Sequence, residues 1–251
     1  MFLHFLKKAV PVPDLDNFSD YLFVGPHPDD IEVACAKTVA KLTKSGKNVA
    51  FVIATNGCVG SVDKTFSSEQ LVELRQAEAL ASAKLLGVQN VVFLPFNDGD
   101  DYNIDDMAKG LCKAILDVKP QVVFCPDHTC PSECHPDHVN VGKATTKAVF
   151  WASWDKLSAR VGLGGSVENI NLAYYFTHKP NAYVKVPKSD VRRQALQLHK
   201  SQFTSEQLDA FLTYFNLREI RLGLKSGKGR AEGYRALSPT QQHCFPEVNE
   251  Y

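Results

Sequence analysis

The stretch "FVGPHPDDIEVA", residues 23–34, joins apolar residues to a histidine flanked by two prolines and then to two adjacent aspartates. The preceding "YLFVG" (21–25) has the length of a buried strand, and "IEVACAKTVAKL" (31–42) has apolar residues at helical spacing. Two neighbouring carboxylates repel each other unless something cationic lies between them. The stretch therefore predicts a strand, a polar loop that holds a charged group, and a helix.

The same alternation continues over the first 150 residues. Further strands are expected at 48–55, 90–95 and 121–126, and further helices at 69–87, 104–120 and 135–152. Continuous apolar strands separated by amphipathic helices indicate a mostly parallel sheet with helices on both faces. We therefore predict an α/β fold, a Rossmann-like three-layer sandwich. In such sheets, ligands bind beyond the carboxyl ends of the strands.

The helix expected over 69–87 has one apolar face, made of Leu71, Leu74, Ala77, Ala81 and Leu85. We expect this face to be buried. One interpretation of Arg75 is then an i,i+3 pair with Glu78 on the exposed face.

The C-terminal part is less regular. Strands are expected at 171–178 and 182–186, and helices at 189–202 and 205–224. No linker is visible, so we predict one domain over residues 1–251, with residues 1–18 as an N-terminal extension. The apolar residues of "MFLHFLKKAVPVP" (1–13) favour a small helix that packs on the domain or on a second subunit, which is compatible with a homo-oligomer.

Charge and composition narrow the function class. Lys+Arg and Asp+Glu are both 28, so the chain lacks the basic excess of a nucleic-acid binder. No apolar run approaches the ~20 residues of a membrane span. The N-terminus lacks the charge-first order of a secretory signal, which predicts a cytoplasmic protein. The odd number of cysteines, 7, argues against a disulfide framework.

Two clusters of polar residues follow strands one and four. His27, Asp29 and Asp30 form the first, and "PDHTCPSECHPDH" (126–138) contains the second. One interpretation is two helix N-termini, with Asp30 as a cap and Asp137 near the helix dipole. The other is a mononuclear metal site, made of His27, Asp30 and a histidine of the second loop. Asp29 would then be free to take a proton from metal-bound water.

Three alternatives compete with this site. Cys130, Cys134, His135 and His138 have a spacing from which a closed structural zinc site can be built, but a second cysteine pair is missing. A Cys–His enzyme with Cys58 or Cys134 as nucleophile lacks a recognisable motif. A non-catalytic nucleotide-binding module would need a glycine-rich loop after strand one, where "GPHPDD" has proline.

"PHPDD" (26–30) and "HPDH" (135–138) closely resemble the motifs of the PIG-L/LmbE-like family of zinc-dependent N-deacetylases. Four further stretches resemble the family: "RQAEALASAKLLGV" (75–88), "LPFNDG" (94–99), "ALQLHKSQ" (195–202) and "AEGYR" (231–235). The likeness covers most of the chain from about residue 20 to 236.

The resemblance implies that His27, Asp30 and His138 bind Zn²⁺, although Fe²⁺ or Co²⁺ would suit the same ligands. It implies that Asp29 is the general base and that His135 stabilises the oxyanion. Amide hydrolysis needs these parts: an activated water, an oxyanion stabiliser and a proton for the departing amine.

The resemblance also implies that Arg75 and Asp98 contact the substrate. The expected activity is removal of an acetyl group from a small N-acetylglucosamine-type amino sugar. The alternative is hydrolysis of a non-sugar or thiol-conjugate amide by the same machinery.

Two stretches depart from the family pattern. Cys58, in "TNGCVGS" (55–61), stands where an acidic residue is usual, which affects one expected substrate contact. The loop over 128–134 has no tyrosine, so His128 and Glu133 are the polar groups available there. His199 is expected to be a packed helix residue.

Overall fold

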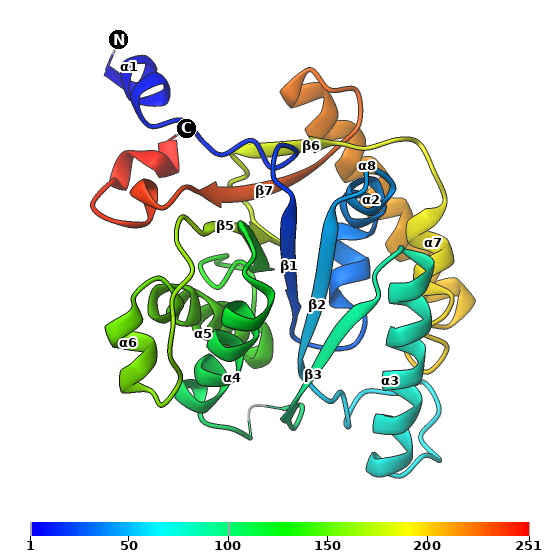
Figure 1. The fold of residues 1–251 in the computed structure, drawn as a ribbon. Helices are drawn as coiled ribbons and strands as arrows, with labels where there is room; N and C mark the ends of the chain where they lie inside the picture. Colours follow the sequence, from blue (N-terminus) through cyan, green and yellow to red (C-terminus); the bar gives the residue numbers. More distant parts are fainter. Residues whose placement is uncertain (1, 100, 251) are drawn as a thin grey trace.

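The computed structural model describes residues 2–99 and 101–250. Its centre is a seven-stranded sheet with the order β3-β2-β1-β4-β5-β7-β6 (Figure 1). The strands are β1 (Asp20–Gly25), β2 (Asn48–Thr55), β3 (Asn90–Phe96), β4 (Val122–Pro126), β5 (Asn171–Tyr175), β6 (Ala182–Lys185) and β7 (Ala231–Leu237). The helices are α1 (Phe2–Ala9), α2 (Asp30–Lys44), α3 (Ser68–Leu85), α4 (Ile104–Val118), α5 (Pro136–Ala152), α6 (Asp155–Arg160), α7 (Val191–Leu196) and α8 (Ser205–Ser226), followed by the short 3₁₀ helices η1 (Thr240–Gln242) and η2 (Pro246–Glu250).

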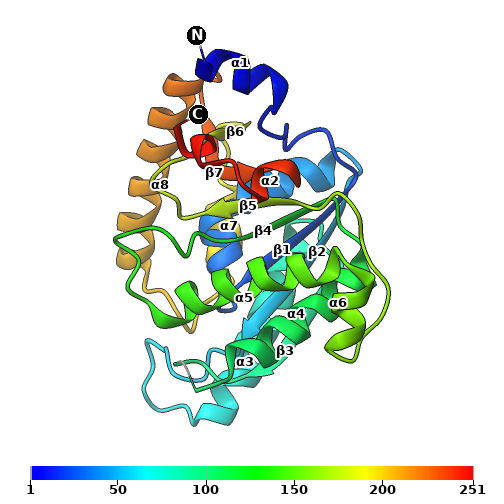
Figure 2. The ribbon, with the colours of Figure 1, turned by 90° about the vertical axis from the view of Figure 1, so that its left-hand side faces the viewer.

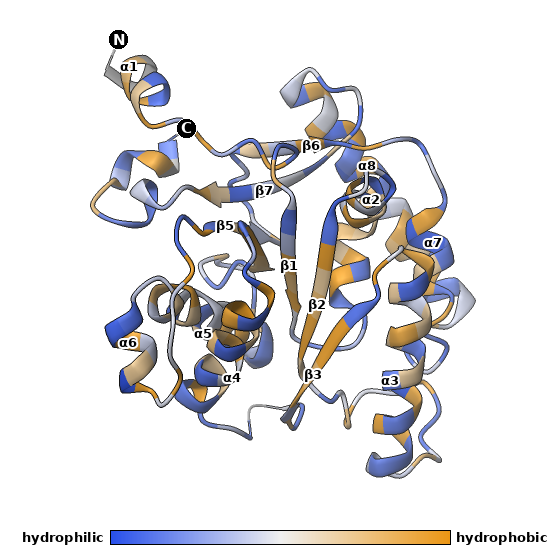
Figure 3. Cartoon of the chain, viewed as in Figure 1, coloured by the Kyte–Doolittle hydropathy of each residue, from blue (hydrophilic) through white to orange (hydrophobic). Residues whose placement is uncertain are grey.

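Helices cover both faces of the sheet. Helices α4, α5 and α6 lie on one face, and α2, α3, α7 and α8 on the other (Figures 1 and 2). Each face has its own apolar core: Phe23 and Phe124 stack 4.2 Å apart on the α2 side, and Leu22 and Val123 face α4 and α5. The strands at the centre, β1 and β2, are therefore largely apolar beyond their polar first residues (Figure 3). The predicted three-layer α/β fold is confirmed.

The order of the strands places the two polar loops together. The chain runs outward from β1 through β2 to β3, and then returns to the other side of β1 to form β4. β1 and β4 are parallel neighbours, with Phe23 paired to Phe124. Such a reversal of strand order opens a crevice at the carboxyl ends of the two strands. The loops after β1 and β4 therefore meet at this crevice.

The eight elements predicted up to residue 152 agree with the structure to within two residues at each end. The C-terminal predictions are less accurate. The predicted helix over 189–202 is shortened to α7, and β7 and α6 were not predicted. β7 pairs antiparallel with β5 and β6 and carries buried Glu232, so it lacks the apolar run of the other strands.

The predicted buried face of the helix over 69–87 is only partly right: Leu71 is buried and Leu74 is half-buried. Ala77, Ala81 and Leu85 are exposed. The buried face of α3 instead includes Arg75 and Glu78, which are 2% and 8% exposed. Their partners lie on distant segments, and these contacts outweigh the hydrophobic pattern of the helix.

The segment before β1 packs partly on the domain. Leu15 is buried in the core, and the Tyr21 hydroxyl donates to its carbonyl oxygen at 2.9 Å. Helix α1 projects from the body beside the C-terminal segment (Figure 1). Among the described helices, none has both the length and the apolar character needed to cross a membrane.

Gly142 lets α5 approach the end of β4. A Cβ atom there would lie 2.6 Å from the Pro126 carbonyl oxygen and 2.9 Å from His128 Cβ. The Pro126 carbonyl oxygen belongs to the backbone and cannot rotate away from an added Cβ atom. Gly142→Ala should therefore lower the free energy of unfolding by about 2 kcal/mol. Gly164→Ala is the matched control, since a Cβ at Gly164 meets nothing within 4 Å. Urea denaturation measures both variants, and equal stabilities would contradict the close approach.

Candidate active site and metal centre

The loop after β1 is anchored on β2. The backbone N–H and hydroxyl of Thr55 donate to the Pro26 carbonyl oxygen at 2.9 and 2.8 Å. Asp30 does not cap α2: its Oδ2 accepts the backbone N–H of His27 at 2.9 Å. The cap position is occupied by Asp29, whose side chain makes no capping bond. Neither carboxylate caps the N-terminus of α2, so both are available for another role.

The loop after β4 is held by a buried ion pair. Asp127 accepts two hydrogen bonds from Arg235 of β7, at 2.8 and 3.1 Å. The loop then leads into α5, where His135 is the N-cap and accepts the backbone N–H of Asp137 through Nδ1 at 3.3 Å. Pro136 occupies the first turn, where its missing N–H is not needed. This start of the helix directs His135 and His138 toward the β1 loop.

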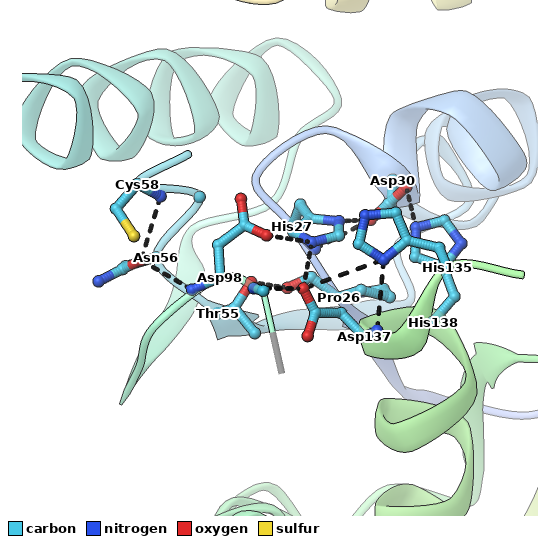
Figure 4. Close-up of polar contacts among 12 residues, drawn as sticks. Pro26, His27, Asp30, Thr55, Asn56, Cys58, Asp98, His135, Asp137 and His138 are labelled. Carbon is cyan, nitrogen blue, oxygen red and sulfur yellow. Dashed lines mark hydrogen bonds and ion pairs between the residues drawn. The ribbon is translucent and has the colours of Figure 1, made fainter. Parts of the chain in front are cut away.

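The two loops bring three imidazoles together (Figure 4). The ring centroid of His27 lies 4.7 Å from that of His135 and 5.4 Å from that of His138. Two overlapping groups of side chains have donor atoms close enough to hold one metal ion. One group is His27, Asp30 and His138, and the other is His27, Asp98, His135 and Asp137.

Asp137 is already committed as a hydrogen-bond acceptor. It is fully buried and accepts from the Gly99 N–H at 2.9 Å and the Tyr102 hydroxyl at 2.7 Å. His27 Nε2 lies 3.0 Å from Asp137 Oδ2. A histidine that binds a metal commonly donates its other ring N–H to a carboxylate in this way. Asp137 therefore orients His27 with Nδ1 facing Asp30, at 3.0 Å.

Glu133 has the same relation to His138. Its Oε2 lies 3.0 Å from His138 Nδ1, and its Oε1 accepts the His135 backbone N–H at 2.9 Å. His138 Nε2 then faces Asp30 Oδ1, at 3.3 Å. Two imidazole nitrogens and a carboxylate thus converge with their outer partners in place, which fits the nitrogen and oxygen ligands of a catalytic zinc site.

The electrostatics of the site favour a cation. Burial lowers the pKa of His27, but hydrogen bonds to Asp137 and Asp30 outweigh it and raise the pKa to about 12. For His138, the charge of Asp30 likewise outweighs burial and raises the pKa to about 9. These shifts reflect an excess of carboxylate around the two rings, which is the environment that a divalent cation would neutralise.

Asp29 lies outside both groups of metal-binding side chains. Its carboxylate is 3.3 Å from Arg75 Nη2, and Arg75 also donates to the Gly57 carbonyl oxygen at 3.0 Å. Burial raises the pKa of Asp29, and Arg75 opposes this shift. Glu78 accepts from the backbone and hydroxyl of Ser201 at 2.9 and 2.6 Å. The alternative interpretation of Arg75, a surface pair with Glu78, is therefore wrong.

Asp98 lies on the Nε2 side of the His27 ring, whereas Asp30 lies on the Nδ1 side. Its Oδ1 is 3.2 Å from His27 Nε2, and its Oδ2 is 4.0 Å from Arg75 Nη1. Its backbone N–H donates to Asn56, which also accepts the backbone N–H of Cys58 (Figure 4). The structure thus places Arg75 and Asp98, two predicted substrate contacts, beside the catalytic candidates.

His135 is the most exposed histidine of the three, with 45% of its side chain accessible. Burial and the neighbouring His27 and His138 lower its pKa, so the ring is neutral at pH 7. Because Nδ1 accepts from the Asp137 backbone, the proton lies on Nε2. His135 therefore offers a hydrogen-bond donor to a bound ligand.

The cysteine alternatives find no support. Cys130 is partly buried and Cys134 exposed, and neither belongs to a metal-binding group among the described residues. His199 is fully buried, as expected, with Nε2 3.4 Å from Glu32, but it lies beyond the end of α7 and not in a helix.

Sequence reasoning missed the outer partners of the histidines. Asp137 was predicted only to interact favourably with the helix dipole of α5. Tyr102 was not predicted as a site residue, because it lies in the loop before α4, where no sequence pattern marks its contact with Asp137. Glu133 was noted as a polar group, but its pairing with His138 depends on the fold of the loop.

The chain is similar to several known proteins. The family model described as GlcNAc-PI de-N-acetylase, PIG-L, matches residues 22–149. The diacetylchitobiose deacetylase of Thermococcus kodakarensis is 30% identical over 230 residues, which are 90% of this chain and 85% of that protein. A 1D-myo-inositol 2-acetamido-2-deoxy-alpha-D-glucopyranoside deacetylase of Kineococcus radiotolerans is 28% identical over 184 residues, which are 61% of this chain and 50% of that protein.

A solved structure is similar over the whole chain. The N,N'-diacetylchitobiose deacetylase of Pyrococcus horikoshii, in complex with an inhibitor, matches with a TM-score of 0.90 and 26% identity. The match covers 100% of this chain and 96% of that one. Together with the family match over half of its residues, this likeness shows that the chain belongs to the PIG-L family of deacetylases.

Proposed function

We propose that this deacetylase removes the acetyl group from an N-acetylglucosamine-type sugar by hydrolysis of the amide. The observation that carries the proposal is the convergence of His27, Asp30 and His138, with Asp29 and His135 beside them, at one crevice. The named activities of the relatives, on diacetylchitobiose and on a glucosaminyl inositol, support a small amino sugar as substrate.

We propose that His27, Asp30 and His138 hold a divalent cation, with Zn²⁺ as the first candidate and Fe²⁺ or Co²⁺ compatible with the same ligands. When bound, such a cation would lower the pKa of a water molecule and polarise the amide carbonyl. The outer carboxylates of Asp137 and Glu133 would each accept the ring N–H of one histidine, and this turns the other ring nitrogen toward the cation.

The remaining residues supply the proton transfers. Asp29 takes a proton from the attacking water and later delivers it to the departing amine. His135 donates its Nε2–H to the carbonyl oxygen, on which negative charge develops as water adds. Arg75 holds Asp29 in place through its ion pair. Arg75 Nη1 and Asp98 Oδ2 lie 4.0 Å apart beside Asp29, and we keep both residues as the proposed substrate contacts.

An acetate-release assay tests this function. The purified protein is assayed with N-acetylglucosamine, N,N'-diacetylchitobiose and the acetylated glucosaminyl inositol, before and after treatment with EDTA and Zn²⁺. We expect release from at least one sugar, loss with EDTA and recovery with Zn²⁺. Zinc-loaded protein that cleaves only non-sugar amides would overturn the sugar assignment and favour the alternative amidase.

Glu133→Ala should weaken Zn²⁺ binding by about 10- to 100-fold, because His138 loses the partner that orients its ring. Competition with a chromogenic chelator measures this affinity directly. Glu247→Ala, in η2 near the C-terminus, is a carboxylate control that should bind Zn²⁺ like the wild type. An unchanged affinity in Glu133→Ala would contradict the orienting role.

Other features remain predictions from the sequence. These are the single domain over 1–251 with residues 1–18 as an extension, the cytoplasmic location and a homo-oligomer. The sheet that extends from Asp20 to Leu237 and the burial of Leu15 support the single domain, while Met1 and Tyr251 lie outside the described residues.

A further inference from the structure

A groove leads from His138 to helix α8. Its walls are the loop after β4, the segment after β5 and one side of α8, which lie together in Figure 2. The lining residues that matter here are Glu133, His138, Phe176, Tyr214 and Arg218. Its volume is about 380 Å³, within the range of small-molecule sites. The groove therefore opens directly beside His138, one of the proposed metal ligands.

Phe176 forms a fixed aromatic wall. Its ring is nearly parallel to that of His138, at 12° and with centroids 5.8 Å apart, and His135 continues the stack at 4.8 Å from His138. The backbone of Phe176 has φ 54°, in the left-handed region that bulky residues rarely adopt. Unusual backbone of this kind concentrates at ligand sites.

Tyr214 and Arg218 complete the groove from α8. Tyr214 is 57% exposed, although it lines the groove and meets Phe215 edge-on at 5.1 Å. Arg218 Nη2 donates to the Thr177 carbonyl oxygen at 2.8 Å, which fixes the guanidinium at the wall. The carboxylate of Glu133 also lines the groove. Because the groove has both this negative charge and the positive charge of Arg218, it suits a neutral polar ligand better than an anion.

A sugar ring has this chemistry. Its hydroxyls surround faces of C–H groups, which carry partial positive charge and stack on the negative face of an aromatic ring. We propose that the groove binds the saccharide unit joined to the N-acetylglucosamine that is deacetylated, with Tyr214 and Phe176 against its faces and Arg218 donating to its hydroxyls. This assignment rests on the proposed function, and it makes the enzyme prefer an oligosaccharide to a single sugar.

The test compares N,N'-diacetylchitobiose with N-acetylglucosamine. Tyr214→Ala should lower the ratio of kcat/KM for the disaccharide to that for the monosaccharide by about tenfold, which corresponds to one aromatic contact. Tyr214→Phe, which keeps the ring, should restore most of the ratio. Leu217→Ala is the matched control, because Leu217 is 63% exposed on the same helix and does not line the groove. A ratio that Tyr214→Ala leaves at the wild-type value would overturn the proposal.

Binding separates this proposal from the proposed function. Calorimetry with zinc-loaded Asp29→Asn measures the affinity for the disaccharide without turnover, alone and combined with Tyr214→Ala. Binding that weakens with Tyr214→Ala supports the groove even if the wild type releases no acetate, in which case only the proposed function fails. Absent binding, or binding that Tyr214→Ala does not change, overturns the groove assignment.

Discussion

Asp29→Ala is expected to lower kcat by about a thousandfold while the protein keeps its metal ion, because general base catalysis contributes roughly 10²–10⁴-fold. Asp29 belongs to neither group of metal-binding side chains, so its loss leaves the ligands in place. Its buried carboxylate has a raised pKa, which makes it a stronger base than an exposed aspartate. Acetate release measures kcat, and elemental analysis measures the metal content.

Asp29→Asn separates the two roles of this residue. Asparagine still accepts a hydrogen bond from Arg75 but cannot take a proton from water near neutral pH. If Asp29 only held Arg75, the asparagine variant would keep much of its activity. We expect both variants to be equally impaired. More than a tenth of wild-type kcat in Asp29→Asn would show that the base is another residue.

His138→Ala should abolish both metal binding and turnover. Removal of a ligand costs more than the 10- to 100-fold of an outer partner, so we expect the affinity for Zn²⁺ to fall by more than about 100-fold. The variant also leaves Asp30 and Glu133 without the imidazole between them, since each lies within 3.3 Å of it. Metal analysis after dialysis and titration with Zn²⁺ provide the measurement.

His135→Ala is the matched control for this variant, because the two rings stack 4.8 Å apart but belong to different metal-binding groups. It should keep the metal and lose about 10²- to 10³-fold in kcat, as expected for loss of an oxyanion donor. The reverse result, with metal lost in His135→Ala and kept in His138→Ala, would place the ion among His27, Asp98, His135 and Asp137.

Several local predictions failed for a common reason. The face of α3 that contains Arg75 is buried because Asp29 and Gly57 bind its guanidinium, and hydropathy alone assigns that face to solvent. β7 was missed because Glu232, which is buried, accepts hydrogen bonds from Thr38 of α2. In both cases, polar groups are buried by partners that are far away in the chain, and such partners leave no local pattern.

The sequence by itself determined the order of strands and helices up to residue 152 and the residues that supply the chemistry, because hydrophobic periodicity and the two histidine–aspartate motifs are local. Only the tertiary structure decided how these residues are used. Asp137 meets His27 across 110 positions of the chain, and Glu133 meets His138 only through the shape of a loop. Ring orientation and proton position follow from such contacts, which depend on the pairing of β1 with β4.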